Sequence, residues 1–276
     1  MIKISLLITT FNDPLRLKQT LDHYLKQNPQ PFEILVCDDG STFETKELVG
    51  AFAKIARTPI IHLYQEDKGW DAPGIRNLGA IMSRGNYLLM TDGDCVPHPR
   101  FIHDHLAAAE DNCFVVGERS HILKEHALAF STRADVLLYY VCTKKIHKRS
   151  FTLRNPFEKP AVYTKECFLK IEPLASKVMA CNFGVWKSDF IAVNGFDESF
   201  RSWWPEDAEC SARLLNSGLK LKKYRKKCLV YHLNHDETSR QCAEEYRFAE
   251  RSLISGARFT TNGIEQRLSR MSKNQG

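Results

Sequence analysis

The sequence predicts an α/β fold in which helices cover both faces of a mostly parallel sheet. Three observations support this prediction. Apolar, β-branched runs alternate with segments of helical periodicity through the first 115 residues, turn signals separate them, and acidic residues directly follow two of the runs. Such alternation is typical of βαβ units, whose strands pair in parallel and whose connecting helices pack on the sheet.

The first two units are recognised from their turn signals. Residues 3–8 form an apolar run that ends before Asn12-Asp13-Pro14, and Pro14 suits the first turn of a helix. Apolar residues at helical spacing predict that this helix continues to about residue 28. The second unit has a predicted strand at 32–37 and a helix over about 42–56.

Two further units follow at the same spacing. Residues 60–64 and 87–90 read as strands, with a polar loop at 65–72 and a helix at 73–83 between them. Ligands of parallel α/β sheets bind beyond the carboxyl ends of the strands. Those ends carry Asp38 and Asp39 in one unit and Asp92 and Asp94 in another, so we expect acidic groups to converge where a ligand binds.

The second half is less regular. Residues 178–186 predict a strand, 188–193 a short helix, 205–218 a second helix, and 219–221 and 229–231 further strands. We expect one domain over 1–238, made of a first half at 1–115, an insert or lid at 116–176 and a second half at 177–238. The insert holds a helical stretch near 125–141 and a basic run. A tail at 239–276 is predicted to be one amphipathic helix with a frayed end.

Composition excludes several classes of protein. Hydrophobic residues make up 43% and charged residues 26% of 276 residues, which suits a globular core. The net charge of +6 fits anionic substrates or a membrane surface without requiring nucleic acid. No apolar run is long enough to span a bilayer or to act as a secretory signal. Nine cysteines without a CxxC pair indicate reduced thiols. We therefore expect a cytoplasmic protein, open to peripheral contact with the inner face of the membrane.

Two phosphate-binding fingerprints are absent from the sequence. Neither the glycine-rich dinucleotide motif nor GxxxxGK[ST] occurs. A nucleotide bound here would have its phosphates held by a metal or by basic side chains. Asp92-Gly93-Asp94 suits a divalent cation with positions left open for phosphate oxygens, although Asp and Gly also form plain turns. Asp38-Asp39-Gly40-Ser41 offers a carboxylate for a uracil or ribose, or simply a helix cap.

The second half offers a further set of chemical groups. Glu206 and Asp207 either complement a helix dipole or, beside Trp203 and Trp204, supply a general base next to a sugar-stacking surface. His232 and His235 either are ordinary histidines or complete a metal site, and a histidine among oxygen ligands favours Mn²⁺ over Mg²⁺. The basic run at 220–227 reads as a solvated strand face.

Several of these motifs, in this order, resemble the family 2 glycosyltransferases of the GT-A fold. SLLITTFND at 5–13 and CDDGS at 37–41 are similar to that family's opening strand and nucleotide-binding turn. The segments at 66–80, 85–102 and 180–198, and YHLNH at 231–235, resemble the bacterial polysaccharide enzymes that include chondroitin polymerases. Their acceptor half is in turn similar to animal galactosyltransferases. The resemblance covers about 1–115 and 176–238, and makes 1–115 the nucleotide-sugar half and 177–238 the acceptor half.

The resemblance implies a role for each matching position. The nucleotide would be held by Thr10, Asp39, Arg76, Asn77 and Asp92. The metal, Mn²⁺ or Mg²⁺, would be held by Asp94 with Asp92 and His232, and His235 is the competing histidine.

In the acceptor half, Asp207 would be the catalytic base with Glu206 in support, and Trp203 and Trp204 would line the acceptor pocket. The subgroup usually reads W-G-G-E-D, whereas this chain has Trp and Pro in place of the two glycines. That change fills space and stiffens the backbone, so a reshaped pocket is expected.

The resemblance thus predicts an inverting, metal-dependent transfer of a sugar from a UDP-sugar to a saccharide or lipid-linked acceptor in surface polysaccharide biosynthesis. Three alternatives stay open: a retaining transferase of the same fold, a nucleotidyltransferase, and a non-catalytic subunit that binds sugar nucleotides. The nucleotidyltransferase is disfavoured because its usual glycine-rich, lysine-bearing loop is missing. The intact acidic pair argues against the non-catalytic subunit.

Overall fold

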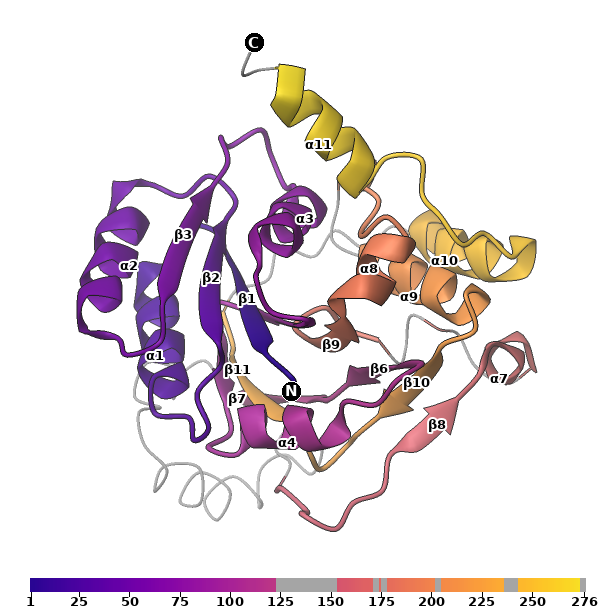
Figure 1. The fold of residues 1–276 in the computed structure, drawn as a ribbon, viewed down its shortest axis with the longest axis horizontal. Coiled ribbons are helices and arrows are strands. Elements are labelled where there is room, and N and C mark those ends of the chain that lie inside the picture. The colour runs from indigo at the N-terminus through magenta and orange to yellow at the C-terminus, as the bar shows by residue number, and fades with distance from the viewer. Residues whose placement is uncertain (123–152, 171–173, 175–177, 202–204, 236–242, 274–276) are drawn as a thin grey trace.

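A computed structural model describes residues 1–122, 153–170, 174, 178–201, 205–235 and 243–273 (Figure 1). The described strands form two sheets. The large sheet has the order β3-β2-β1-β4-β9-β6-β10-β8, and the small one has the order β5-β11-β7. The predicted α/β architecture is confirmed.

The four predicted βα units form one half of the large sheet. Its strands are β1 (Ile4–Thr10), β2 (Glu33–Asp38), β3 (Ile60–Tyr64) and β4 (Tyr87–Asp92), and neighbours among them pair in parallel. The register aligns Thr10 of β1 with Asp38 of β2, and Thr9 with Asp92 of β4. The carboxyl ends of three neighbouring strands therefore meet at one edge, as the sequence predicted.

Helices pack on both faces of this sheet. One face is covered by α1 (Pro14–Tyr24), α2 (Phe43–Ile55) and α4 (Phe101–Ala108), whose apolar side chains share a core with Ile4, Leu6 and Ile8 of β1. The other face packs against α3 (Ala72–Met82), α8 (Lys187–Ala192) and α9 (Glu206–Asn216). Successive residues of β1 thus serve opposite cores, which explains why the strand reads as a continuous apolar run.

The second half of the chain completes the large sheet with mixed pairing. β9 (Asn182–Trp186) lies antiparallel between β4 and β6 (Cys113–Val116), and β10 (Lys220–Lys223) lies between β6 and β8 (Ala161–Tyr163). The small sheet joins β5 (Cys95–Pro97), β7 (Glu118–Ile122) and β11 (Leu229–Leu233). The sequence interpretation missed α4, β5, β6 and β7, and it began β9 four residues too early.

The range predicted to be an insert contributes to both sheets. Its described parts include β7, β8 and α7 (Lys165–Lys170), which hold positions within the fold. Arg154 also pairs with the buried Asp104 of α4 at 2.6 Å, which ties this range to the first half. The helical stretch expected near 125–141 and the basic run after it lie outside the described residues.

The tail differs from the single frayed helix that was predicted. Its described part forms two helices, α10 (Ala243–Ser255) and α11 (Ile264–Lys273), and Gly256 between them has a positive φ of 75°. Ile264 is buried in the main core, and α11 lies beside α3 (Figure 1). The polar sequence of α11 hid this docking, because its contacts are made mainly by charged side chains rather than by an apolar stripe.

The basic run at 220–227 is also corrected. Lys222 and Lys223 are only 8% and 7% exposed, so the prediction is wrong for these two residues, whereas Lys220, Arg225 and Lys226 are exposed as expected. The Lys222 ammonium donates to the Ala108 carbonyl at 2.8 Å and to Glu110 at 2.9 Å, and Lys223 donates to the Gly117 carbonyl at 2.8 Å. A buried ammonium is tolerated here because carbonyl and carboxylate oxygens replace its water.

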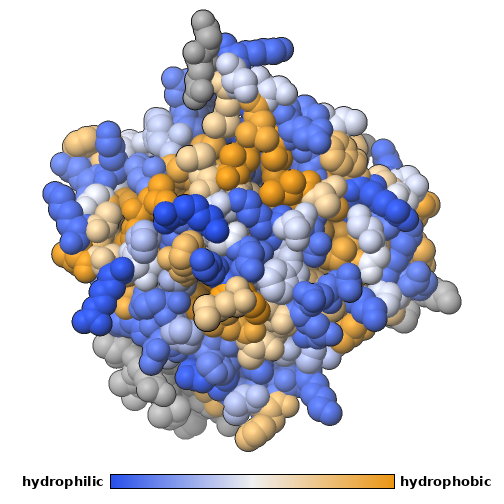
Figure 2. All heavy atoms as spheres, in the orientation of Figure 1, coloured by the Kyte–Doolittle hydropathy of each residue, from blue (hydrophilic) through white to orange (hydrophobic). Residues whose placement is uncertain are grey.

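The surface agrees with the composition. Figure 2 shows hydrophilic side chains over much of the viewed face, with hydrophobic side chains interspersed. Among the helices that the structure describes, none has the length and apolar character needed to cross a bilayer. The described cysteines are free thiols, as the sequence indicated.

A buried ion pair in α9 gives a test of this packing. Arg213 is fully buried, holds Glu209 through its Nε and Nη2 groups at 2.6–3.0 Å, and also donates to the Val193 carbonyl. Arg213→Met should lower the free energy of unfolding by about 3–5 kcal/mol, because it leaves Glu209 as an uncompensated buried charge.

Urea denaturation measures this effect, and Lys18→Met is the matched control. Lys18 forms the same i,i+4 type of pair with Asp22, but both side chains are exposed and their separation is 2.8 Å. Its loss should cost at most about 1 kcal/mol. Equal effects of the two substitutions would contradict the assignment of Arg213 as a buried structural charge.

Candidate functional site

Side chains from three strand ends meet at the carboxyl edge of the large sheet. Thr10 ends β1, Asp39 follows β2, and Asp92 ends β4. The Asp39 amide donates to the Thr10 carbonyl at 3.0 Å, which fixes these two strand ends against each other. A Cβ added to Gly93 would lie 3.0 Å from the Thr10 hydroxyl, so glycine allows the Asp92-Gly93-Asp94 turn to pass close to β1.

The two aspartates after β2 have different partners. Asp38 accepts from the Ser41 amide at 2.8 Å and lies 2.8 Å from the His62 ring, so it holds the turn itself. Gly40 has a φ of 96°, and a Cβ there would meet the backbone of Asp67. Asp39 instead lies toward the loop after β3, and burial raises the pKa of its carboxyl. Asp38 is therefore a turn residue, which leaves Asp39 as the candidate for binding.

Arg76 connects the carboxyl edge of the large sheet to the start of α9. Its guanidinium donates to the Thr9 hydroxyl at 3.0 Å, to Asp92 at 3.1 Å and to Glu206 at 2.8 Å. The side chain is only 6% exposed. Although burial opposes it, the charges of Asp92 and Glu206 raise the pKa of Arg76, so it remains a cation. Loss of hydration and the neighbouring charge of Asp94 raise the pKa of Asp92, which Arg76 counteracts.

Glu206 and Asp207 form an adjacent pair of buried carboxylates at the start of α9. Asp207 accepts from the backbone amides of Ala180 at 3.0 Å and Ala208 at 2.6 Å. Glu206 uses one oxygen for Arg76, and its other oxygen is buried without a hydrogen-bond partner in the described part of the chain. Burial and the charge of Asp207 raise the pKa of Glu206 to about 7, and burial also raises the pKa of Asp207.

Asp94 and the two histidines gather around one point. The Nε2 atoms of His232 and His235 lie 3.1 and 3.0 Å from the same Asp94 oxygen. One ligand atom from each of the three residues lies within 4.8 Å of the others, which suits a shared cation. Although burial opposes it, hydrogen bonds from both histidines hold the pKa of Asp94 well below its usual value. The donors therefore fit a divalent metal that accepts oxygen and imidazole ligands.

The two histidines differ in how firmly they are held. His232 lies in β11, is 3% exposed, and has its Nδ1 atom 2.8 Å from the Asn234 side-chain oxygen. His121 of the paired strand β7 contacts the same Asn234 oxygen at 2.9 Å. An oxygen at Nδ1 places the proton there and leaves Nε2 free for a metal. His235 follows the strand and is 26% exposed.

Three neighbours of this site were not anticipated from the sequence. Cys95 of β5 and Cys181, just before β9, lie with Asp92 in a second group whose ligand atoms are within 4.8 Å of one another. Arg119 of β7 adds a partly buried guanidinium whose buried Nε atom has no partner among the described residues, and although burial opposes it, nearby acidic groups that include Asp92 and Asp94 raise its pKa. Arg119 reaches this site because β7 pairs with β11 in the small sheet, and the sequence did not predict that pairing.

The remaining predicted residues are not all brought to this edge. Asn77 is fully buried, and its amide group bonds to Phe196 at 2.8 and 2.9 Å and to Glu198 at 3.0 Å, so it faces the protein interior here. Trp203 and Trp204 lie outside the described residues. The expected acceptor contacts of these tryptophans and the nucleotide contact of Asn77 stay predictions.

Comparison with known families defines the class of protein to which this chain belongs. The profile of glycosyl transferase family 2 matches residues 5–179. That range is more than half of the chain, so the protein belongs to glycosyl transferase family 2. A second profile, the N-terminal domain of galactosyltransferase, matches residues 163–236. The two matched ranges agree with the resemblance seen in the sequence motifs.

The chain is also similar to two curated bacterial synthases. The chain is 25% identical over 224 residues to a hyaluronan synthase of Pasteurella multocida, which covers 78% of this chain and 23% of that protein. It is 26% identical over 228 residues to a chondroitin synthase of Escherichia coli, covering 78% of this chain and 32% of that protein. The chain thus spans about a quarter to a third of the length of these relatives.

Solved structures confirm the fold. S. aureus TarS 1–349 in complex with UDP-GlcNAc aligns with a TM-score of 0.65 at 14% identity, covering 96% of this chain and 69% of that one. A mannosyltransferase of Pyrobaculum calidifontis, in complex with GDP-Man and Mn²⁺, aligns with a TM-score of 0.57 at 13% identity, covering 86% and 58%. These likenesses show a GT-A fold.

The unequal placement of the histidines gives a prediction about metal binding. His232→Ala should weaken Mn²⁺ binding on the order of tenfold or more, because its ring is fixed by Asn234. His235→Ala should weaken it less, since that ring is more exposed and follows the strand. Electron paramagnetic resonance of free Mn²⁺ measures both affinities. A larger loss in His235→Ala would make His235 the principal ligand.

The raised pKa of Glu206 gives a prediction about stability. Between about pH 5 and 8 the unfolded chain has lost the Glu206 proton, whereas the native state, with a pKa of about 7, releases it only at the top of this range. The native state therefore binds more protons, and stability should fall as the pH rises.

Comparison with Glu206→Gln isolates this group. Relative to that variant, the wild type should lose up to about 3 kcal/mol of unfolding free energy from pH 5 to 8. Urea denaturation at each pH gives the slope, which is unaffected by any constant offset from the lost Arg76 contact. Parallel pH profiles for the two proteins would show that the Glu206 pKa is not raised.

Proposed function

We propose that this chain is an inverting, metal-dependent glycosyltransferase domain. It moves a sugar from a UDP-sugar to a saccharide or lipid-linked acceptor in polysaccharide biosynthesis. The observation that carries the proposal is the convergence of Asp92, Asp94 and the Glu206-Asp207 pair at one edge of a family 2 fold. Arg76 bonds to both Asp92 and Glu206, so the end of β4 and the start of α9, which carries the candidate base Asp207, are held together.

The donor half of the proposal rests on the strand ends. Asp39 and Thr10 would hold the uridine, and Asp92 the ribose, beyond the carboxyl ends of β1, β2 and β4. The match to TarS, whose structure contains UDP-GlcNAc, supports a UDP-sugar as donor. The match to a mannosyltransferase with GDP-Man keeps guanosine donors as the alternative that an experiment must separate.

The metal part of the proposal rests on the donor set. Asp94, His232 and His235 would hold Mn²⁺ or Mg²⁺, with Asp92 beside them. When bound, such an ion would neutralise negative charge on the departing diphosphate. The depressed pKa of Asp94 keeps this carboxylate charged over the whole physiological range. Arg119, on the strand beside β11, would add a fixed positive charge on the same side.

The acceptor half of the proposal rests on Asp207 as general base. Asp207 would accept the proton of an acceptor hydroxyl as that oxygen attacks the anomeric carbon from the face opposite the leaving diphosphate. Backbone amides of Ala180 and Ala208 hold the carboxylate in place. Glu206 would act by positioning, since it fixes Arg76 and thereby Asp92.

A panel of ligands tests the proposal most directly. Thermal unfolding should be measured with UDP, GDP and their sugars, each with and without Mn²⁺, because a ligand that binds only the native state raises the melting temperature. We expect UDP to stabilise the protein and Mn²⁺ to enlarge the effect. Stabilisation by GDP alone would overturn the uridine assignment, and no nucleotide response would overturn the donor site.

Products separate the rival reactions. An inverting enzyme gives the opposite anomeric configuration from that of its donor, which the anomeric proton signal reports. Retention of configuration would favour a retaining transferase of the same fold. Release of pyrophosphate instead of a nucleoside diphosphate would indicate a nucleotidyltransferase.

The role of Asp207 gives a prediction of its own. Asp207→Asn should lower the transfer rate by about 10²–10⁴-fold, because an amide cannot accept the proton of the acceptor. Its affinity for UDP should stay close to that of the wild type, since the uridine site lies at the other strand ends. Transfer rate and UDP affinity are to be measured on the same purified variant.

Glu206→Gln is the comparison for this experiment. If Glu206 only positions Arg76, the amide oxygen still accepts a hydrogen bond, and the rate should fall less than in Asp207→Asn. A larger loss in Glu206→Gln would move the base to Glu206, whose pKa of about 7 suits proton transfer near neutral pH.

A further inference from the structure

The C-terminal helix α11 lies beyond both family profiles, which end at residues 179 and 236. It nevertheless packs beside α3, the helix that carries Arg76 (Figure 1). Arg267 of α11 has a side chain only 13% exposed, which is unusual for a charged residue on a terminal helix. A buried arginine needs specific partners, and those partners lead toward the donor site.

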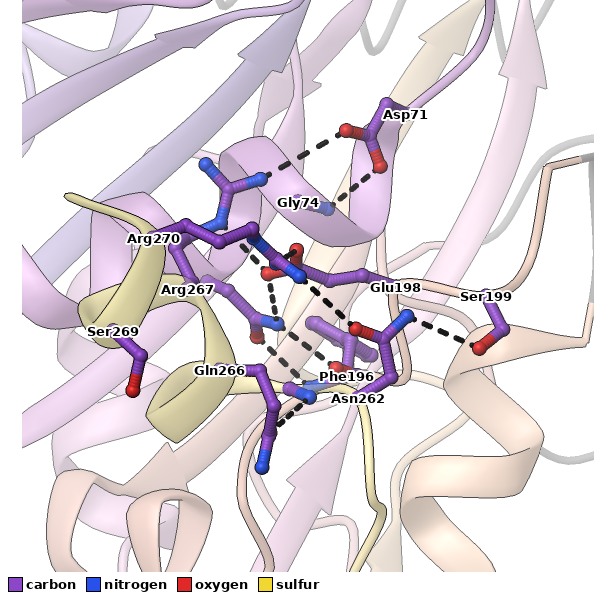
Figure 3. Close-up of polar contacts among 12 residues, drawn as sticks. Asp71, Gly74, Phe196, Glu198, Ser199, Asn262, Gln266, Arg267, Ser269 and Arg270 are labelled. Carbon is purple, nitrogen blue, oxygen red and sulfur yellow. Dashed lines mark hydrogen bonds and ion pairs between the residues drawn. The ribbon is translucent and has the colours of Figure 1, made fainter. Parts of the chain in front are cut away.

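The first partner is Glu198, in the turn after β9 and α8 (Figure 3). Arg267 donates to one Glu198 oxygen at 2.7 Å, and Arg270 donates to the other. The Asn77 amide donates to the same oxygen as Arg267, at 3.0 Å. Glu198 therefore fixes α11 to α3 through two arginines, each bonded to one of its oxygens.

Of these two arginines, only Arg267 also contacts the loop after β3 among the described residues. Its guanidinium donates to the Gln65 side-chain oxygen at 3.3 Å and lies 3.8 Å from the Asp71 carboxylate. Gly74 allows this approach, because a Cβ there would lie 2.1 Å from the guanidinium. Figure 3 shows Arg267 together with Asp71 and with Gly74 of α3.

Gln65 and Asp71 in turn hold Asp39. The Gln65 amide donates to one Asp39 oxygen at 2.6 Å, and the Asp71 backbone amide donates to the other at 2.9 Å. Gln65 also donates to the Asp71 carbonyl at 3.1 Å, which closes the loop on itself. Both oxygens of Asp39 are therefore oriented by the loop segment that Arg267 contacts.

We infer that Arg267 is a positioning residue for the donor nucleotide, acting through Gln65 and Asp71 on Asp39, so that α11 is part of the nucleotide site. This inference rests on the proposed function, in which Asp39 holds the uridine. A carboxylate that must accept hydrogen bonds from a uracil or ribose in one geometry benefits from being fixed before the ligand arrives. Arg267 fixes it without touching the ligand.

The experiment measures UDP affinity by calorimetry in the presence of Mn²⁺, with the full chain. Arg267→Ala should weaken UDP binding by about tenfold, a loss typical of removing a group that orients a ligand-binding side chain. Arg270→Ala is the control, since it also removes a positive charge and a Glu198 ion pair from α11 but leaves the contacts with Gln65 and Asp71. Its UDP affinity should stay within about twofold of wild type.

Two further variants locate the effect. Gln65→Ala leaves the α11 ion pairs intact but removes the Gln65 hydrogen bond to Asp39, while the Asp71 amide still holds the other oxygen, so it should weaken UDP binding in the same direction as Arg267→Ala. The double variant Arg267→Ala/Gln65→Ala should lose little more than either single one, because residues in one pathway are not additive. In steady-state kinetics the Michaelis constant for the donor should rise while the turnover number at saturating donor changes little.

Each outcome decides the question. Equal UDP affinity for Arg267→Ala and Arg270→Ala would overturn the inference and leave α11 a structural tail. The same conclusion would follow if Arg267→Ala proved unstable while the folded Gln65→Ala bound UDP normally. Failure of the wild type to bind UDP would overturn the proposed uridine assignment, on which the inference rests, a result distinguishable because it appears without any substitution.

Discussion

The structure depends above all on one buried cation among carboxylates. Arg76 is almost fully buried and meets Asp92 at the end of β4 and Glu206 at the start of α9, two residues separated by more than a hundred positions in the sequence. Without it, two carboxylates would face each other in a region of poor hydration, and the cost would be several kcal/mol for each unpaired charge. With it, the two halves of the chain have a fixed relation at the point where donor and acceptor would meet. Because a guanidinium is planar and offers several donors, one side chain can hold Thr9, Asp92 and Glu206 together.

The charges around this pair explain why a cation belongs to the proposed function. In the described part of the site, the carboxylates of Asp39, Asp92, Asp94, Glu206 and Asp207 outnumber the arginines Arg76 and Arg119. A nucleoside diphosphate is itself an anion and would be repelled by such a set. Burial and, after it, the same crowding of negative charge raise the pKa values of Asp92 and Glu206. Asp94 is the exception, since two histidines lower its pKa, and this makes it the carboxylate best prepared to meet a metal ion.

Sequence reasoning succeeded where local signals carry the information. The first four strands agree with their predicted ranges to within two residues, because each ends in turn residues and each is flanked by a periodic helix. The positions of Asp39, Asp92 and Asp94 followed from the same logic, since the end of a parallel strand fixes where a side chain lies. It failed where a contact depends on distant pairing. Arg119 and His121 reach the site only because β7 pairs with β11, and Lys222 is buried only because α4 ends beside it. Nothing near these residues in the sequence indicates such partners.

The C-terminal helix shows the same limit in another way. A polar, basic sequence at a chain end usually indicates exposure, and the periodicity of residues 264–273 offers few apolar positions for docking. The helix nevertheless docks because Glu198 forms ion pairs with Arg267 and Arg270, and Asp71 with Arg267. Gly74 leaves room for the Arg267 guanidinium. Such a contact is specified by charges on three separate segments rather than by hydrophobic pattern. A segment outside the family profiles is therefore bound, through Arg267, to the residues around the proposed nucleotide site.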